Sequence, residues 1–234
     1  MNPDILYIPI KSDSERESVA TAWESSGGVV KRLDKFWIKP NSEDANFSIY
    51  GNDTLSLVLA QIINATLVSP RDELIAELDN QWIKRDIELI SIEAISKIQF
   101  PRFCKPVTPK LFQSQIYDSR ESLMESLIDL KKEELIIISS IVDIEAEVRS
   151  FVLNSTICDL AIYDGQADID EAKNFIQDFI QSSNSELPNS YVLDAGYNSK
   201  LGWFIIEFNA AWGAGLNSCN PKKVIACIRE ATKH

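Results

Sequence analysis

The chain has 234 residues and a formal net charge of −12 at pH 7. A chain of this length can bury enough apolar surface to fold without disulfides or a structural metal. The negative charge disfavours nucleic acid and anionic membranes as partners. No window approaches 18 apolar residues, and the amino-terminal segment 1–4 lacks the basic region of a leader, so we expect a cytoplasmic protein.

The histidine and cysteine content restricts the possible chemistry. The only histidine is His234, the last residue, which excludes an internal Ser-His-Asp or Cys-His centre and a histidine zinc site. The four cysteines form no C-x-x-C pair and are expected to be reduced, mostly buried thiols. Any catalysis would therefore depend on carboxylates, lysines, arginines and a bound cofactor.

The first hundred residues alternate between predicted strands and helices, which is typical of a small α/β layer. Hydrophobic periodicity and capping signals predict strands at 4–10, 36–39 and 47–50, and helices at 14–25, 53–64 and from Pro70 onward. The pattern becomes richer in strands near residue 98. We therefore expect a boundary there, with domains at 1–98 and 99–234.

The residue pattern of the second part of the chain, 99–234, predicts an α+β arrangement. Its expected strands are 103–107, 111–117, 135–139, a hairpin of 146–153 with 157–163, and the pair 191–195 and 203–209. Its expected helices begin after the caps at Asp118-Ser119, Asp168 and Asn220-Pro221.

Two polar residues of the strand 203–209 share one face. Side chains alternate along a strand, so Glu207 and Asn209 lie on the same side, about 6.5–7 Å apart along the backbone. Oxygen donors at this spacing suit a magnesium–phosphate cluster. Asp194, on the preceding strand, can face Glu207 if the two strands pair in a suitable register. A solvated sheet face is the alternative explanation of these residues.

Cationic residues on two earlier strands are further candidates. Lys105 lies in the strand RFCKP, with Arg102 and Lys110 close by in sequence, and such cations suit phosphate oxygens or simply a solvated edge strand. Glu147 and Arg149 share a strand face, where they form either a partly buried ion pair or an arginine clamp for phosphate that the glutamate orients.

In chain order these segments resemble the ATP-grasp superfamily. The matching segments are FCKP, LIIISSIVDIEAEVRSFVL, YVLDAGY and GWFIIEFNAAWGAGLN. They are most similar to the clade characterised by one arginine and two lysines. That clade shares a K-P…P-K-x-F segment like 105–112, an E-x-R strand like 147–149 and an E-F-N-x-x-W-G-x-G ending like 207–215. The resemblance covers about residues 100–220, and extends more loosely over YGNDTLSLVLAQ and NQWIKR.

The resemblance implies a fold and a set of roles. The fold is an α+β ATP-grasp fold, in which two lobes with antiparallel sheets grip ATP, preceded by a small α/β domain. The implied nucleotide contacts are Lys105, Lys110, the adenine connector Ser140, Ile141 and Val142, and Glu147 with Arg149, of which Arg149 and Lys105 would be catalytic. The implied metal ligands, for one or two Mg²⁺ ions, are Asp194, Glu207 and Asn209.

Where many relatives carry an acidic hinge residue that contacts the nucleotide, this chain has Ser139-Ser140, and Asp143 is the nearest candidate. Tyr197, Trp212 and Asn217 are candidates for a substrate pocket, but each could equally be a packing residue.

The resemblance implies an ATP- and Mg²⁺-dependent ligase that joins a carboxylate to an amine or thiol through an acyl phosphate. The carboxylate and the amine could be small molecules or peptides, and neither they nor the oligomeric state can be read from the sequence. Two alternatives share the same site: a nucleotide-binding module or sensor without turnover, and an ATP-grasp phosphotransferase acting on a hydroxyl. The intact set of two acids and one amide argues against the module, because a degenerate copy would lose those groups first.

Overall fold

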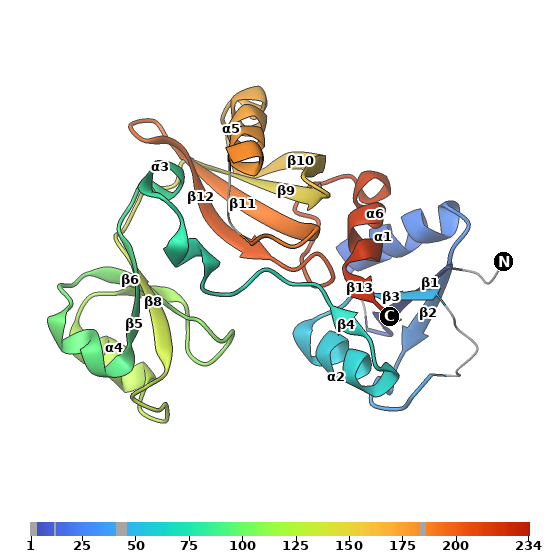
Figure 1. Ribbon diagram of the computed structural model, residues 1–234, viewed down its shortest axis with the longest axis horizontal. Coiled ribbons are helices and arrows are strands. Elements are labelled where there is room, and N and C mark those ends of the chain that lie inside the picture. Colours follow the sequence, from blue (N-terminus) through green and yellow to red (C-terminus); the bar gives the residue numbers. More distant parts are fainter. Residues whose placement is uncertain (1–3, 12, 41–45, 183–185) are drawn as a thin grey trace. The chain divides into compact units, whose positions relative to one another are not determined.

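The computed structural model describes residues 4–11, 13–40, 46–182 and 186–234. The chain divides into two compact units, which are described separately here (Figure 1). The first unit contains Met1–Pro70, Ala146–Ala195 and Glu207–His234, and the second contains Arg71–Glu145 and Gly196–Ile206. This division differs from the predicted boundary at residue 98, because the chain returns to the first unit at Ala146 and contributes Gly196–Ile206 to the second unit later in the sequence.

The strands and helices follow one another in an irregular order along the chain. The strands are β1 (Asp4–Pro9), β2 (Val29–Leu33), β3 (Asn46–Ile49), β4 (Thr66–Leu67), β5 (Ile87–Ser91), β6 (Arg102–Pro106), β7 (Gln115–Tyr117), β8 (Leu135–Ser139), β9 (Ala146–Leu153), β10 (Thr156–Gly165), β11 (Ser190–Asn198), β12 (Gly202–Asn209) and β13 (Thr232–Lys233). The α-helices are α1 (Ser14–Ser25), α2 (Asp53–Ile63), α3 (Asn80–Ile83), α4 (Arg120–Ser126), α5 (Ile169–Ser182) and α6 (Pro221–Glu230). Two 3₁₀ helices, η1 (Leu74–Glu77) and η2 (Ile92–Lys97), complete the set.

The amino-terminal layer of the first unit is a parallel sheet in the order β2-β1-β3. Helices α1 and α6 contact each other beside it, as Figure 1 shows. Trp23 of α1, Phe151 of β9, Val192 of β11 and Val224 of α6 belong to one buried cluster. Because residues so distant in sequence share a single core, the amino-terminal layer and the strands of the carboxy-terminal part fold as one body.

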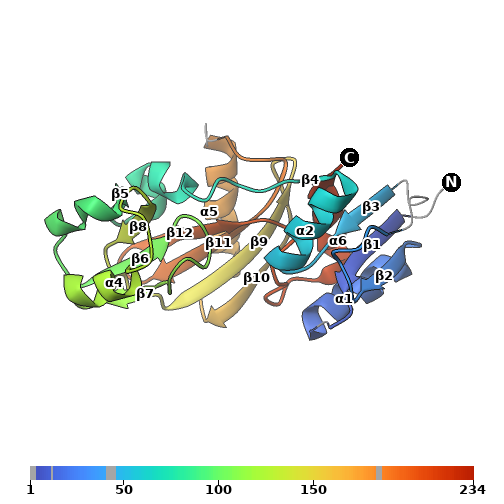
Figure 2. The same cartoon turned by 90° about the horizontal axis from the view of Figure 1, so that it is seen from below.

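The larger sheet has the order β10-β9-β11-β12, and helix α5 packs against β10 (Figure 2). The tight turn between β9 and β10 has Asn154 and Ser155 at φ values of 47° and 60°. Two consecutive positive φ values are typical of a type I′ hairpin turn, which fits the predicted hairpin. The register of β9 with β10 shifts between Ile162 and Asp164, which leaves Tyr163 as the extra residue of a bulge.

The second unit contains the antiparallel sheet β5-β8-β6-β7. One face packs on η2 and α4, with Cys104, Ile136 and Ile138 in the buried cluster. On the opposite face, Lys105 and Leu89 each lie directly across from Ile137. Directly opposed residues point to the same side of a sheet. Lys105 therefore projects from an apolar row, on the face opposite the buried cluster of Cys104, Ile136 and Ile138.

Several local predictions differ from the structure. Residues 36–39 form a turn, and the strand of that region is β2, whose half-exposed residues lack the strict alternation that would have indicated a strand. No α-helix begins at Pro70; the 3₁₀ helix η1 and the short α3 occupy that segment. Strand β7 is confirmed as the partner of β6 but is limited to Gln115–Tyr117.

The predicted helix caps are confirmed. Asn52 accepts a hydrogen bond from the N–H of Leu55, and Asn220 accepts one from the N–H of Lys222 with Pro221 following it. Ser119 forms a capping box with Ser122 at the start of α4. Three cysteines are buried and Cys158 is half-buried, all as free thiols. Among the described residues, no helix has both the length and the apolar character needed to span a membrane.

Candidate functional site

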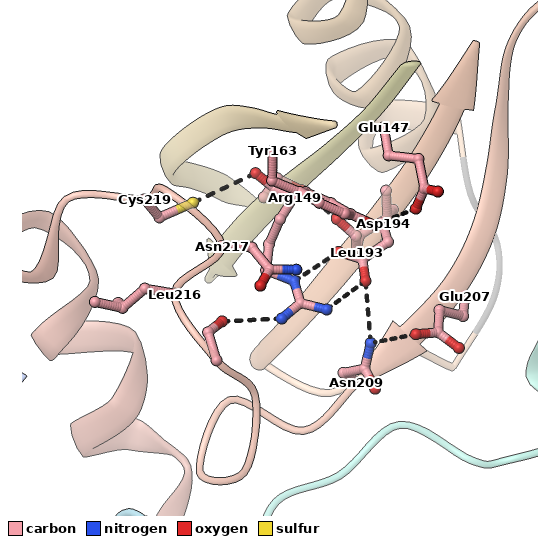
Figure 3. A network of polar contacts seen from close by, with 12 residues as sticks. Glu147, Arg149, Tyr163, Leu193, Asp194, Glu207, Asn209, Leu216, Asn217 and Cys219 are labelled. Atoms are coloured by element: carbon pink, nitrogen blue, oxygen red, sulfur yellow. Dashed lines mark hydrogen bonds and ion pairs between the residues drawn. The ribbon is translucent and has the colours of Figure 1, made fainter. Parts of the chain in front are cut away.

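Arg149 is the centre of a buried polar network in the first unit (Figure 3). Its Nε and Nη2 atoms donate to the two carboxylate oxygens of Asp194, at 2.8 and 2.5 Å, and its Nη1 donates to the carbonyl of Gly215 at 2.9 Å. The two side chains of the pair are 10% and 2% exposed. Contacts among the described residues use three of the five guanidinium N–H groups, which leaves two for a ligand.

Burial and the neighbouring carboxylates shift the pKa values of both members of this pair. Burial acts to lower the pKa of Arg149, but the hydrogen-bonded carboxylate of Asp194 outweighs it and the pKa is raised. Burial raises the pKa of Asp194, and the hydrogen bonds from Arg149 oppose that effect. The negative charges of Glu207 and Glu147 raise the pKa of Asp194 further. An additional positive group near these acids would therefore be stabilising.

Asn209 connects two of the acids. Its Nδ2 donates to Oδ2 of Asp194 at 3.3 Å and to Oε1 of Glu207 at 3.1 Å. Figure 3 shows the amide between the two carboxylates, which come from the neighbouring strands β11 and β12. The structure thus brings together the three residues that the sequence proposed as metal ligands. It also shows what the sequence did not predict, namely that Arg149 already binds both oxygens of Asp194.

Glu147 on the same strand as Arg149, β9, and Tyr163 on the neighbouring strand β10 lie beside the guanidinium. The hydroxyl of Tyr163 donates a hydrogen bond to Oε2 of Glu147, and its ring lies 5.9 Å from Cζ of Arg149. Burial, followed by the hydrogen bond to Glu147, raises the pKa of Tyr163. The bulge at Tyr163 is what a sequence pattern cannot reveal, so this residue was not among the predicted candidates.

In the second unit, the predicted connector follows strand β8. Ser140 donates its N–H to the carbonyl of Asp86 at 2.9 Å, and its hydroxyl accepts from the N–H of Asp86 at 3.1 Å. Ile141 is 45% exposed and Val142 is half-buried in the coil that follows. Lys110 is exposed and has a φ of 67°. The position of the connector is thus fixed by its neighbour, the start of β5.

Arg85 fixes this region and was also missed by sequence reasoning. Its guanidinium donates to the carbonyls of Ile83, Ile205 and Ile206 at 2.9, 2.7 and 3.3 Å, and to the hydroxyl of Ser139 at 3.2 Å. Burial lowers its pKa to about 10. A buried arginine that donates to several carbonyls holds the segments that carry them together. The only sequence signal for this residue was the loosely matching segment NQWIKR, which ends at Arg85.

The residues considered for a substrate pocket have different surroundings. Trp212 is 6% exposed and donates from Nε1 to the hydroxyl of Ser69 at 3.0 Å, which makes it a packing residue. The ring of Tyr197 is tilted against that of Trp203, with centroids 5.3 Å apart. Asp143, the candidate for the acidic hinge residue, accepts a hydrogen bond at its backbone carbonyl from Asn198. Within the described ranges, no group of three or more His, Cys, Asp or Glu side chains is arranged to hold a metal. A metal here would thus need Asn209 and ligand oxygens besides Asp194 and Glu207.

A comparison with protein-family models decides the family. Residues 82–227, more than half of the chain, match the model of an ATP-grasp domain, family 2 of the clade named for one arginine and two lysines. The chain belongs to this ATP-grasp family. The predicted resemblance and the α+β ATP-grasp fold are thereby confirmed. No curated protein sequence matches the chain.

Solved ATP-grasp structures share the fold at low sequence identity. A RimK domain protein of Sphaerobacter thermophilus is 14% identical, with a TM-score of 0.62 over 97% of this chain and 98% of that one. D-alanine–D-alanine ligase of Bacillus anthracis, solved with ATP, is 10% identical, with a TM-score of 0.57 over 99% and 97%. The ligase PsnB, solved with a phosphomimetic variant of a minimal precursor, Mg and ADP, is 11% identical, with a TM-score of 0.55 over 99% and 98%.

Proposed function

We propose that this ATP-grasp protein is an ATP- and Mg²⁺-dependent ligase that joins a carboxylate to an amine or a thiol. Several neighbours in fold are ligases, and one of them was solved with Mg and ADP. The observation that carries the proposal is the network of Arg149, Asp194, Glu207 and Asn209 on neighbouring strands. The substrates proposed are a small-molecule or peptide carboxylate and amine.

The donor set of the network fits Mg²⁺. Asn209 places a partly positive NH₂ group between the oxygens of Asp194 and Glu207, where a cation would be neutralised by both. Rotation of the amide by 180° would present its oxygen instead, giving two carboxylates and one amide oxygen, which are the hard donors that Mg²⁺ prefers. When bound, Mg²⁺ would neutralise phosphate charge. We assign Asp194, Glu207 and Asn209 to it.

The roles of the cations follow from their surroundings. Arg149 has two N–H groups beyond its contacts with Asp194 and Gly215, and a guanidinium suits phosphate oxygens. Lys105 projects from the sheet face that also carries Leu89 and Ile137, and its ammonium group suits phosphate oxygens. We assign the phosphates to Lys105, Lys110 and Arg149, and the base to the connector Ser140–Val142.

The proposed reaction has two steps. A carboxylate oxygen of the first substrate attacks the γ-phosphorus, and ADP leaves. The amine nitrogen or thiol sulfur of the second substrate then attacks the acyl carbon, the bond from that carbon to the phosphate oxygen breaks, and phosphate leaves together with the proton lost by the amine or thiol. Arg149 stabilises negative charge on the transferred phosphoryl group, and the buried carboxylate of Asp194 keeps the guanidinium charged and oriented. This chemistry requires no histidine, in agreement with the composition.

The test is product analysis of the full chain with Mg²⁺ and ATP over a panel of carboxylates, amines, thiols and peptides. A ligase releases ADP and phosphate in equal amounts, and only when the carboxylate and Mg²⁺ are both present. Nucleotide binding without turnover over the whole panel would instead identify a binding module. Recovery of the phosphate on a hydroxyl would identify a phosphotransferase.

A further inference from the structure

The loop Ala210–Asn217, which follows β12, is held by the amino-terminal layer of the first unit. The N–H of Gly51 donates to the carbonyl of Trp212 at 3.0 Å, and the hydroxyl of Tyr50 donates to the carbonyl of Ala214 at 2.8 Å. Tyr50 is buried at 1% exposure. The conformation of the loop is therefore set by residues more than 150 positions earlier in the chain.

Glu15, in the first turn of α1, makes a further contact with this loop. Its Oε2 accepts a hydrogen bond from the N–H of Leu216 at 3.0 Å, and its Oε1 accepts one from the N–H of Asn217 at 2.9 Å. Hydrogen bonds to an ionised acceptor are about twice as strong as neutral ones. Both oxygens of one carboxylate thus hold two successive peptide groups.

Gly215 links this contact to Arg149. Its carbonyl accepts from Nη1 of Arg149 at 2.9 Å, and the next residue, Leu216, donates to Glu15. A Cβ at position 215 would lie 2.5 Å from Oε2 of Glu15, so a larger residue there would displace that carboxylate. A continuous path therefore runs from the carboxylate of Glu15, through the single peptide group between Gly215 and Leu216, to the guanidinium of Arg149.

We propose that Glu15 is a positioning residue that holds the carbonyl of Gly215 on Arg149 and thereby fixes the guanidinium for the γ-phosphate. The inference rests on the proposed function. The two bonds to Asp194 fix the guanidinium relative to that carboxylate alone. The carbonyl of Gly215 comes from a different segment and adds a third, independent point of attachment.

A purely structural role predicts a different result from a positioning role. If Glu15 only joined α1 to the loop, its loss would lower the stability of the protein and weaken the binding of every nucleotide to the same extent. If Glu15 positions Arg149, its loss weakens the binding of a nucleotide that has a γ-phosphate more than the binding of one that lacks it. The ratio of the two affinities therefore distinguishes the roles.

The experiment measures binding of Mg²⁺·AMPPNP and Mg²⁺·ADP to the full chain by calorimetry. Glu15→Gln keeps the size of the side chain, but its NH₂ group faces an N–H donor, so one hydrogen bond is lost. The control is Glu17→Gln on the same helix, where the carboxylate pairs with Arg32. We expect Glu15→Gln to reduce the AMPPNP-to-ADP affinity ratio about five- to tenfold, since one charge-assisted bond is at stake. An unchanged ratio overturns the proposal.

A second measurement does not depend on nucleotide binding. The ¹⁵N signals of the Arg149 guanidinium, assigned by their loss in Arg149→Lys, should shift or broaden in Glu15→Gln and stay unchanged in Glu17→Gln. If the wild-type chain bound neither nucleotide, the proposed function would fail, and these signals would decide the role of Glu15 alone. Should Glu15→Gln not fold, Gly215→Ala takes its place, because its Cβ displaces the carboxylate while residue 15 itself is unchanged. Unshifted signals in the folded variant contradict the proposal.

Discussion

Arg149 and Asp194 form a bidentate pair that is almost fully buried, with Nε and Nη2 of the arginine 2.8 and 2.5 Å from the two oxygens of the aspartate. A buried pair contributes little net stability, but breaking it by removing one partner leaves an uncompensated charge. The pair therefore connects the stability of the first unit to the chemistry of the site.

Asp194→Ala is expected to lower the free energy of unfolding by about 3–5 kcal/mol, because the guanidinium of Arg149 remains buried without its partner. The measurement is urea unfolding followed by circular dichroism. The matched control is Lys223→Met, which breaks the pair of Lys223 with Asp159 on an exposed side chain and should change stability little. Equal effects of the two variants would show that the Arg149–Asp194 pair is not buried in solution.

Lys105→Met is expected to weaken binding of Mg²⁺·ATP about 10- to 100-fold, as expected for loss of one charge-assisted contact of about 1.5–3 kcal/mol. Loss of the charge should leave the fold intact, because Lys105 lies on the face opposite the core of its unit. Lys132→Met, an exposed change in the same unit, is the control. Equal affinities of Lys105→Met and Lys132→Met for Mg²⁺·ATP would show that Lys105 does not contact the nucleotide.

Arg85→Met is expected to lower the free energy of unfolding by about 2–3 kcal/mol, since the carbonyls of Ile83, Ile205 and Ile206 lose a charged donor. Hydrogen exchange followed by mass spectrometry should show faster exchange in β12. Protection equal to that of the wild type would mean that these carbonyls have other donors.

The stability of the second unit should depend on pH through Glu145. Its carboxylate accepts hydrogen bonds from the N–H and the hydroxyl of Ser199, at 3.0 and 2.7 Å, and the backbone bond is the main cause of its lowered pKa. A lowered pKa in the folded state means that the stabilisation is complete above the unfolded-chain pKa of about 4.3 and is lost as pH falls through the lower folded value.

Urea midpoints measured from pH 7 down to pH 3 should therefore fall less steeply for Glu145→Gln than for the wild type. The control is Glu133→Gln, an exposed change in the same unit. Parallel curves for the wild type and Glu145→Gln would contradict the contribution of Glu145.

Periodicity and capping signals were sufficient for most of the fold. Helices α2, α4 and α6 begin where Asn52, Ser119 and Asn220 predicted, because a cap is a local interaction. Strand β2 was missed because its half-exposed residues show no clear alternation. The return of the chain to the first unit is a tertiary property, since it depends on the shared core of residues such as Trp23 and Phe151.

The sequence predicted which residues belong to the candidate site but not which of them contact one another. Strand alternation placed Glu207 and Asn209 together, and the structure places Asp194 beside the same amide. Sequence could not show that Arg149 binds Asp194, because the two residues are 45 positions apart and their contact depends on strand order. Nor could it show Glu15 on the loop or Tyr163 on its bulge, which depend on packing and register.

The most direct test of the account is the Mg²⁺ dependence of nucleotide binding by the full chain. Calorimetry with AMPPNP, with and without Mg²⁺, would compare the wild type with Glu207→Gln and with Glu88→Gln, an exposed change on β5. The account predicts tight binding only with Mg²⁺ for the wild type and Glu88→Gln, and loss of most of the Mg²⁺-dependent gain for Glu207→Gln. Binding that is independent of Mg²⁺, or equal in wild type and Glu207→Gln, would contradict it.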